Sequence, residues 1–172
     1  QLALAEEIGA QDSPRLIPEN FELRLDVFGL CALVLAEDGL AWNMRILIDS
    51  PLGQKYGFSE KASAAAPKKI AEIINLIDRR LEAQEKIDSR FLVGSGLTAA
   101  DIYWATMSMS VLPVSTDIMP MTRQNRGMLS FFESNSKIAD IAEALTQRIK
   151  QHQIFILKTY CETPAVLGGD PL

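Results

Sequence analysis

The segment GLTAADIYWATM, residues 96–107, constrains the fold more than any other part of the chain. Thr98 is followed three residues later by Asp101, which is the spacing of a capping box at the N-terminus of a helix. Behind this start, apolar side chains fall on nearly every side of a helix predicted over residues 98–112. A helix that is apolar all round is buried, so we predict that it lies at the centre of the fold. We expect Thr98 and Asp101 to form a structural N-cap, because a polar cap inside a core must satisfy its hydrogen bonds.

Apolar residues also recur at helical spacing in the first third of the chain. A long helix is predicted over residues 19–36, where apolar side chains occupy two adjacent faces. The segment EDGL then interrupts the pattern, and a second, shorter helix is predicted over residues 41–48. Residues 55–63 are polar, and we predict a loop there.

The remaining segments follow the same periodicity. Residues 67–85 carry the clearest amphipathic stripe, with Pro67 either in the first turn or at a kink. Residues 113–134 are predicted to be an irregular connection with one short helix, and residues 138–160 to form one or two helices. No convincing strand alternation occurs. The sequence therefore predicts an all-α protein, with four or five main helices packed as a bundle.

Composition argues against several classes of function. The net charge of −5 without a long like-charge run argues against nucleic acid as a partner. No apolar run approaches the roughly 20 residues of a membrane span, and we expect no membrane partner. Cys31 and Cys161 lie far apart, which favours free thiols and a cytoplasmic location. The single histidine, His152, has no acidic or cysteine neighbour in sequence, so we predict a surface or capping histidine and no metal site.

The capping box belongs to a longer motif. Phe91, Leu92, Val93 and Gly94 stand directly before the Leu97–Asp101 segment, and DIYWA follows it. In this order the residues resemble the C-terminal helical domain of cytosolic glutathione transferases. In that family a Phe-hydrophobe-Gly run precedes the same N-capping box.

Two further segments are similar to a bacterial group within that family. The segment VFGL at residues 27–30 resembles a Met-Phe-Gly-Leu segment in the first long helix. The segment GLAWNMRI at residues 39–46 is similar to Gly-Phe-Gly-Trp-x-Arg-Arg-Leu, with Met44 in place of the first arginine. Asp38 also replaces a glycine.

The resemblance implies a division of the protein and of its chemistry. Residues 1–18 would be the last helix of a thioredoxin-like domain and an interdomain linker, and residues 19–172 would be the helical domain. Glutathione would be a co-substrate, bound mainly by the thioredoxin-like domain, which also supplies the catalytic residue. The chain alone would then not be catalytic. A homodimer and a small hydrophobic electrophile are the partners that the resemblance implies.

In that family the helical domain supplies an apolar wall for the electrophile. The residues expected in this wall are Phe28, Cys31, Leu35, Trp42, Arg45 and Tyr103. The residues themselves leave other interpretations open. The apolar members can be core, Cys31 can be a small buried side chain, and Arg45 can pair with Glu37 or Asp49 or be solvated. A non-catalytic helical interaction module remains the alternative function.

Overall fold

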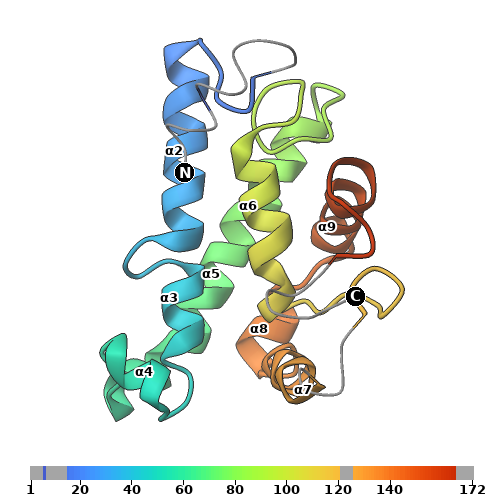
Figure 1. Cartoon of the computed structure of the whole chain (residues 1–172). Helices are drawn as coiled ribbons and strands as arrows, with labels where there is room; N and C mark the ends of the chain where they lie inside the picture. Colours follow the sequence, from blue (N-terminus) through green and yellow to red (C-terminus); the bar gives the residue numbers. More distant parts are fainter. Residues whose placement is uncertain (1–5, 7–14, 121–125, 166–172) are drawn as a thin grey trace.

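The computed structural model describes Glu6, residues 15–120 and residues 126–165, and these residues form an all-helical fold (Figure 1). The all-α prediction is confirmed for them. Most of the segment 1–18, including its predicted helix, lies outside the described residues. The elements are α2 (Phe21–Leu35), α3 (Leu40–Arg45), α4 (Pro51–Lys55), α5 (Glu60–Glu85), α6 (Ala99–Met107), the 3₁₀ helix η1 (Ser108–Ser110), α7 (Arg126–Asn135), α8 (Ala139–Ala144) and α9 (Gln147–Tyr160).

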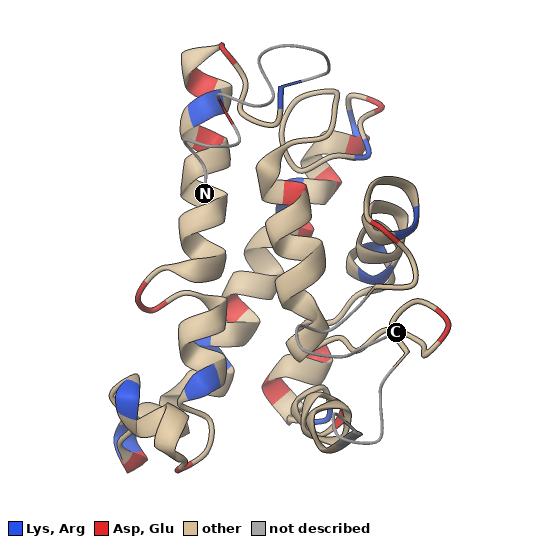
Figure 2. Ribbon diagram, viewed as in Figure 1, with Lys and Arg blue, Asp and Glu red and all other residues tan. Residues whose placement is uncertain are grey.

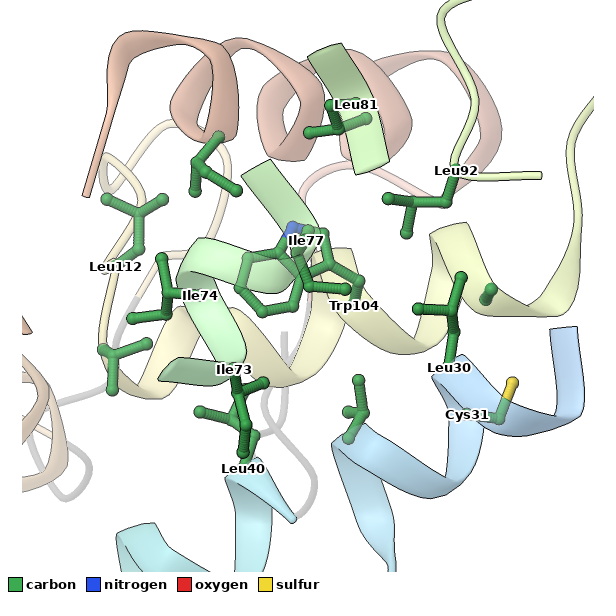
Figure 3. Close-up of a cluster of buried hydrophobic side chains, with 14 of the residues drawn as sticks. Leu30, Cys31, Leu40, Ile73, Ile74, Ile77, Leu81, Leu92, Trp104 and Leu112 are labelled. Carbon is green, nitrogen blue, oxygen red and sulfur yellow. The ribbon is translucent and has the colours of Figure 1, made fainter. Parts of the chain in front are cut away.

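The helix α6 lies inside the bundle, as predicted. Trp104 and Ala105 have no exposed surface, and α2 and α9 both pack against α6. Trp104 belongs to the same buried cluster as Ile77 of α5 and Leu30 of α2 (Figure 3). The predicted helix over residues 98–112 is interrupted after Met107, where the backbone tightens into η1.

The helix α2 buries only one of its two apolar faces. The Asn20 side chain caps its start by accepting a hydrogen bond from the Leu23 N–H at 3.0 Å. One face packs into the core through Val27, Leu30, Cys31 and Val34. The other face carries Phe21, Leu25 and Leu35, which are 71%, 56% and 40% exposed. The sequence showed that both faces are apolar, but only the packing shows which one is covered.

The break between α2 and α3 is a tight turn that requires glycine. A Cβ atom added at Gly39 would lie 2.6 Å from the carbonyl oxygen of Leu33, which no side chain tolerates. The Asn43 amide group donates hydrogen bonds to the carbonyl oxygens of Asp38 at 2.6 Å and Gly39 at 2.9 Å. These contacts explain why the EDGL segment interrupts the helical pattern.

The helix α5 begins earlier than predicted. The prediction of a loop over residues 55–63 is wrong for its last residues, which belong to α5. Ser59 caps this helix and accepts a hydrogen bond from the Ala62 N–H at 3.1 Å. Pro67 therefore lies inside α5 rather than in its first turn. Four alanines within residues 62–66 have a high helix propensity, and with the Ser59 cap they start the helix well before Pro67.

The last part of the described chain forms two helices, α8 and α9, and α7 precedes them. Thr146 caps α9 and also donates its hydroxyl hydrogen to Asp78 of α5 at 2.5 Å. The helix α8 packs closely against α5. Residues 138–160 thus form two helices, in agreement with the sequence-based prediction. None of the described helices has the combination of length and apolarity that a bilayer crossing needs.

Candidate functional site

The residues predicted for the electrophile wall fall into two separate groups of contacts. Trp42 and Arg45 of α3 pack around Tyr56, which follows α4. The Trp42 ring meets the Tyr56 ring edge-on at 5.0 Å between centroids, and the Arg45 guanidinium lies 4.6 Å from the centre of the same ring. Arg45 also donates a hydrogen bond to the carbonyl oxygen of Ala41 at 2.7 Å. The Arg45 guanidinium is therefore already bound by Ala41 and Tyr56.

The two ion pairs considered for Arg45 do not form. Within the described residues, Arg45 makes no salt bridge to Glu37 or Asp49, and the Asp49 carboxylate instead accepts a hydrogen bond from Gln54. Its pairing with one of these two carboxylates, the alternative from the sequence, is thus wrong. The half-buried guanidinium is held by an aromatic face, which needs no opposite charge.

The second group lies where α2 packs against α6. Cys31 is 2% exposed, while Phe28 and Tyr103 are half-buried at the edge of the same core cluster. Arg24 lies over the Phe28 ring at 5.1 Å from its centre. Leu35, at the end of α2, is 40% exposed and faces away from this core. The interpretation of Cys31 as a small buried side chain agrees with this placement.

Burial also makes the Cys31 thiol unreactive. Desolvation, with a smaller contribution from the charge of Asp101, raises the pKa of Cys31 to about 12. Burial raises the pKa of Tyr103 as well, with a lesser effect from Cys31. Thiolate, the nucleophilic form of cysteine, is therefore scarce at Cys31 near neutral pH.

Alkylation tests this environment directly. At a pH near 8, iodoacetamide should modify Cys31 in the folded protein more slowly than in urea, by a factor on the order of a thousand, because both thiolate and access are lost. Peptide mass spectrometry after timed quenching measures the rate at each cysteine. Cys161, which is half-buried, is the internal comparison and should react faster than Cys31. Equal rates at Cys31 with and without urea would contradict the described burial.

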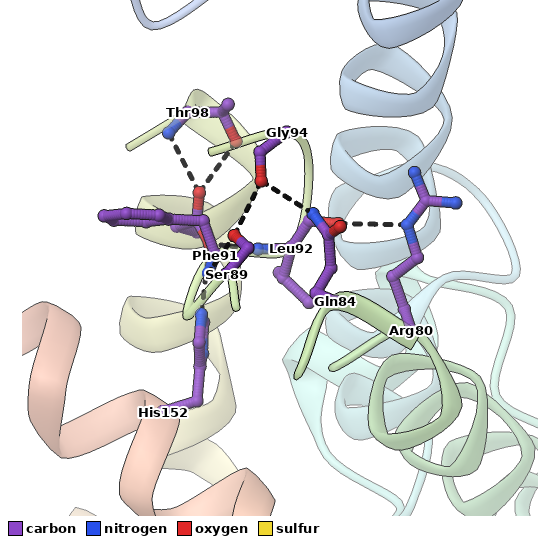
Figure 4. A network of polar contacts seen from close by, with 9 residues as sticks. Arg80, Gln84, Ser89, Phe91, Leu92, Gly94, Thr98 and His152 are labelled. Carbon is purple, nitrogen blue, oxygen red and sulfur yellow. Dashed lines mark hydrogen bonds and ion pairs between the residues drawn. The ribbon is translucent and has the colours of Figure 1, made fainter. Parts of the chain in front are cut away.

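The buried polar centre of the molecule is the Asp101 carboxylate, whose partners Thr98, Leu92 and His152 are labelled in Figure 4. The predicted capping box with Thr98 is formed. One carboxylate oxygen accepts from the Thr98 N–H at 2.9 Å and the Thr98 hydroxyl at 2.8 Å. The other accepts from the Leu92 N–H at 2.7 Å and lies 3.0 Å from Nε2 of His152. Asp101 thus joins three parts of the chain: the start of α6, the loop before it, and α9.

His152 differs from its predicted place. It is 5% exposed and its ring contacts Asp101, so the prediction of a surface or capping histidine is wrong. The two residues are 51 positions apart, and no spacing rule links them. Only the packing of α9 on α6 brings them together. The second ring nitrogen, Nδ1, is buried and has no hydrogen-bond partner in the described part of the chain.

The loop before α6 is held by a second set of hydrogen bonds. The carbonyl oxygen of Gly94 accepts from Ser89 Oγ at 2.6 Å and from Gln84 Nε2 at 3.0 Å (Figure 4). Arg80 Nε donates to the carbonyl oxygen of Leu92 at 3.0 Å. Gly94 has φ of +66°, a conformation that favours glycine. The FLVG motif therefore forms the loop that passes next to the Asp101 carboxylate.

This arrangement stabilises the fold and fixes one histidine. Asp101 orients the His152 ring through Nε2, while Nδ1 is buried without a hydrogen-bond partner in the described residues. Within the ranges that the structure describes, no group of three or more His, Cys, Asp or Glu side chains is placed to hold a metal ion. The chain matches no protein-family model, no curated protein and no solved structure.

Proposed function

We propose that this chain is the helical domain of a glutathione-transferase-like protein, where it forms part of the wall for a small hydrophobic electrophile and contributes to a homodimer. The motif resemblance supports the family assignment, since the FLVG run and the capping box form one buried loop-and-helix unit around Asp101. Phe28 and Tyr103, on neighbouring helices, are the wall residues that remain half-exposed at one junction.

The observation that carries the proposal is the apolar face of α2, defined as Phe21, Leu25, Phe28, Ala32 and Leu35. These residues follow one another at alternating intervals of four and three, the spacing of a helix seam that packs against another helix. Four of them are exposed and Phe28 is half-buried, and residues 27–35 carry no charged side chain (Figure 2). An exposed apolar strip of this kind marks a surface for a protein partner. A second copy of the same helix offers the matching seam.

Light scattering after size exclusion tests the role of this face. Leu25→Glu places a charge in the middle of the strip, and we expect it to shift the protein from dimer to monomer at micromolar concentration. Ile87→Glu is the matched control, because Ile87 is 67% exposed and lies in the turn after α5, outside the apolar face of α2. A monomeric parent protein would rule out the homodimer.

Calorimetry with glutathione tests the proposed chemistry. A protein that carries the proposed thioredoxin-like domain together with this chain should bind glutathione, and the 172-residue chain alone should not, because that domain holds the tripeptide. If the two-domain protein also fails to bind, the transferase assignment falls. Two observations favour the alternative, a non-catalytic helical interaction module. Arg45 packs on the Tyr56 ring and Cys31 is buried, so neither side chain is free to contact a substrate.

A further inference from the structure

A hollow of about 110 Å³ lies between the end of α5, the loop after it and α9. We call it the α9 hollow. Its volume is well above the roughly 10–15 Å³ that a single water molecule needs, so it has room for a small polar group. The side chains that give the hollow its chemistry are Ser89, Arg90, Arg148, Gln151, His152 and Phe155.

Arg90 is the uncommitted cation of this hollow. Its guanidinium lies over the Phe155 ring, with Cζ 3.6 Å from the ring centre. Among the described residues it forms no salt bridge with a carboxylate. Arginine in such a position offers several N–H donors in one plane, which suits an oxygen-rich anion.

Arg148 is the second cation, and it is held in place. Its Nη1 atom donates to Asp78 at 2.8 Å and its Nε atom donates to Glu85 at 3.0 Å. Glu85 is the acidic side chain among the lining residues, and it pairs with Arg148. Because Asp78 and Glu85 balance the charge of Arg148, Arg90 supplies the unpaired positive charge among the described residues of the lining.

His152 lies at the buried side of the hollow. Its Nε2 atom is bound to Asp101, and its Nδ1 atom is without a partner in the described residues. In the protonated ring both nitrogens carry hydrogen, so the bond to Asp101 can persist while Nδ1–H donates to an anion.

We propose that the α9 hollow binds a small oxyanion, either a carboxylate or a tetrahedral phosphate-like group, which Arg90 and Arg148 hold while protonated His152 donates to it. The site is separate from the apolar face of α2 and does not depend on the proposed transferase function. Because a protonated ring donates through both nitrogens, the anion and the proton on His152 strengthen each other's binding. The charged side chains that line the hollow are Glu85 from α5, Arg148 on α9 and Arg90 from the loop, and Asp101 of α6 contacts the His152 ring.

Nuclear magnetic resonance provides a direct test, since His152 is the only histidine in the chain. Sodium acetate and sodium sulfate are titrated separately into the protein, at constant ionic strength set with chloride, near pH 6 and near pH 8. Neither probe changes its charge between these two pH values. We expect the His152 ring signals to shift saturably at millimolar anion, with several-fold tighter binding near pH 6. A response to acetate alone assigns a carboxylate ligand, and a response to sulfate alone assigns a phosphate-like one.

Two substitutions should act in opposite directions. Arg90→Gln is expected to weaken anion binding about tenfold through the loss of a charge-assisted contact, and Glu85→Gln to strengthen it by removing a repelling carboxylate. Arg79→Gln removes the same charge at an exposed position of α5 outside the lining and should leave binding unchanged. The proposal is overturned if neither anion moves the His152 signals, or if Arg79→Gln weakens binding as much as Arg90→Gln does.

Discussion

Replacing Asp101 with alanine is expected to lower the free energy of unfolding by about 3–5 kcal/mol, the largest effect of any single charged residue in this chain. The side chain is fully buried and accepts from the Thr98 N–H and hydroxyl, the Leu92 N–H and the His152 ring. Without it, two backbone donors and the histidine lose their partner in a place that water does not reach. Urea denaturation followed by circular dichroism measures the change.

The control for this substitution is Asp140→Ala. Asp140 also lies in the first turn of a helix, α8, but its side chain is exposed. Its replacement should change stability by less than about 0.5–1 kcal/mol. Asp101→Asn keeps the size of the side chain but brings amide hydrogens against backbone donors, so an intermediate loss is expected. Coinciding urea midpoints for Asp101→Ala and Asp140→Ala would show that the buried network contributes nothing measurable.

Trp104→Ala is the second substitution with a large expected effect, and it should lower the free energy of unfolding by about 3–5 kcal/mol. Trp104 has no exposed surface and is the largest fully buried side chain among the described residues. It fills the space between α6 and the cluster that includes Ile77 and Leu30 (Figure 3). Its removal leaves a cavity that the surrounding helices close only in part. Urea or thermal unfolding of the variant gives the size of the loss.

Trp104→Phe separates the volume of the ring from its polar atom. The indole N–H is buried and has no hydrogen-bond partner in the described residues, so its loss carries no penalty of its own. We expect Trp104→Phe to cost about 1–2 kcal/mol, from the smaller ring alone. Ile87→Ala, at a side chain that is 67% exposed, should have little effect. A loss for Trp104→Phe as large as for Trp104→Ala would mean that the indole nitrogen has a partner.

Local patterns predicted the parts of the fold that depend on near neighbours in sequence. The capping box at Thr98 and Asp101 formed because its partners are three residues apart. The stripe of residues 67–85 became the buried side of α5 for the same reason, since helical periodicity places those residues on one face. The prediction was wrong at the start of α5, because the Ser59 cap and the alanines after it begin the helix before Pro67.

The candidate sites depended on contacts that no local pattern contains. His152 and Asp101 are 51 residues apart, and Arg148 reaches Asp78 across 70 residues. For the wall residues, the sequence identified apolar side chains but not their separation into a group around Tyr56 and a group between α2 and α6.

The sequence by itself determined that this protein is helical, where the helix over residues 21–35 lies, and that Asp101 caps a buried helix. Those features follow from hydrogen bonds and side-chain spacing within a few residues, which are present in the chain before it folds. Only the tertiary structure decided which face of α2 is covered, that His152 is buried, and that Arg90 and Arg148 line the same hollow as His152. Helix packing sets these outcomes, because several apolar faces compete for one core and the arrangement that buries most of them leaves the others exposed.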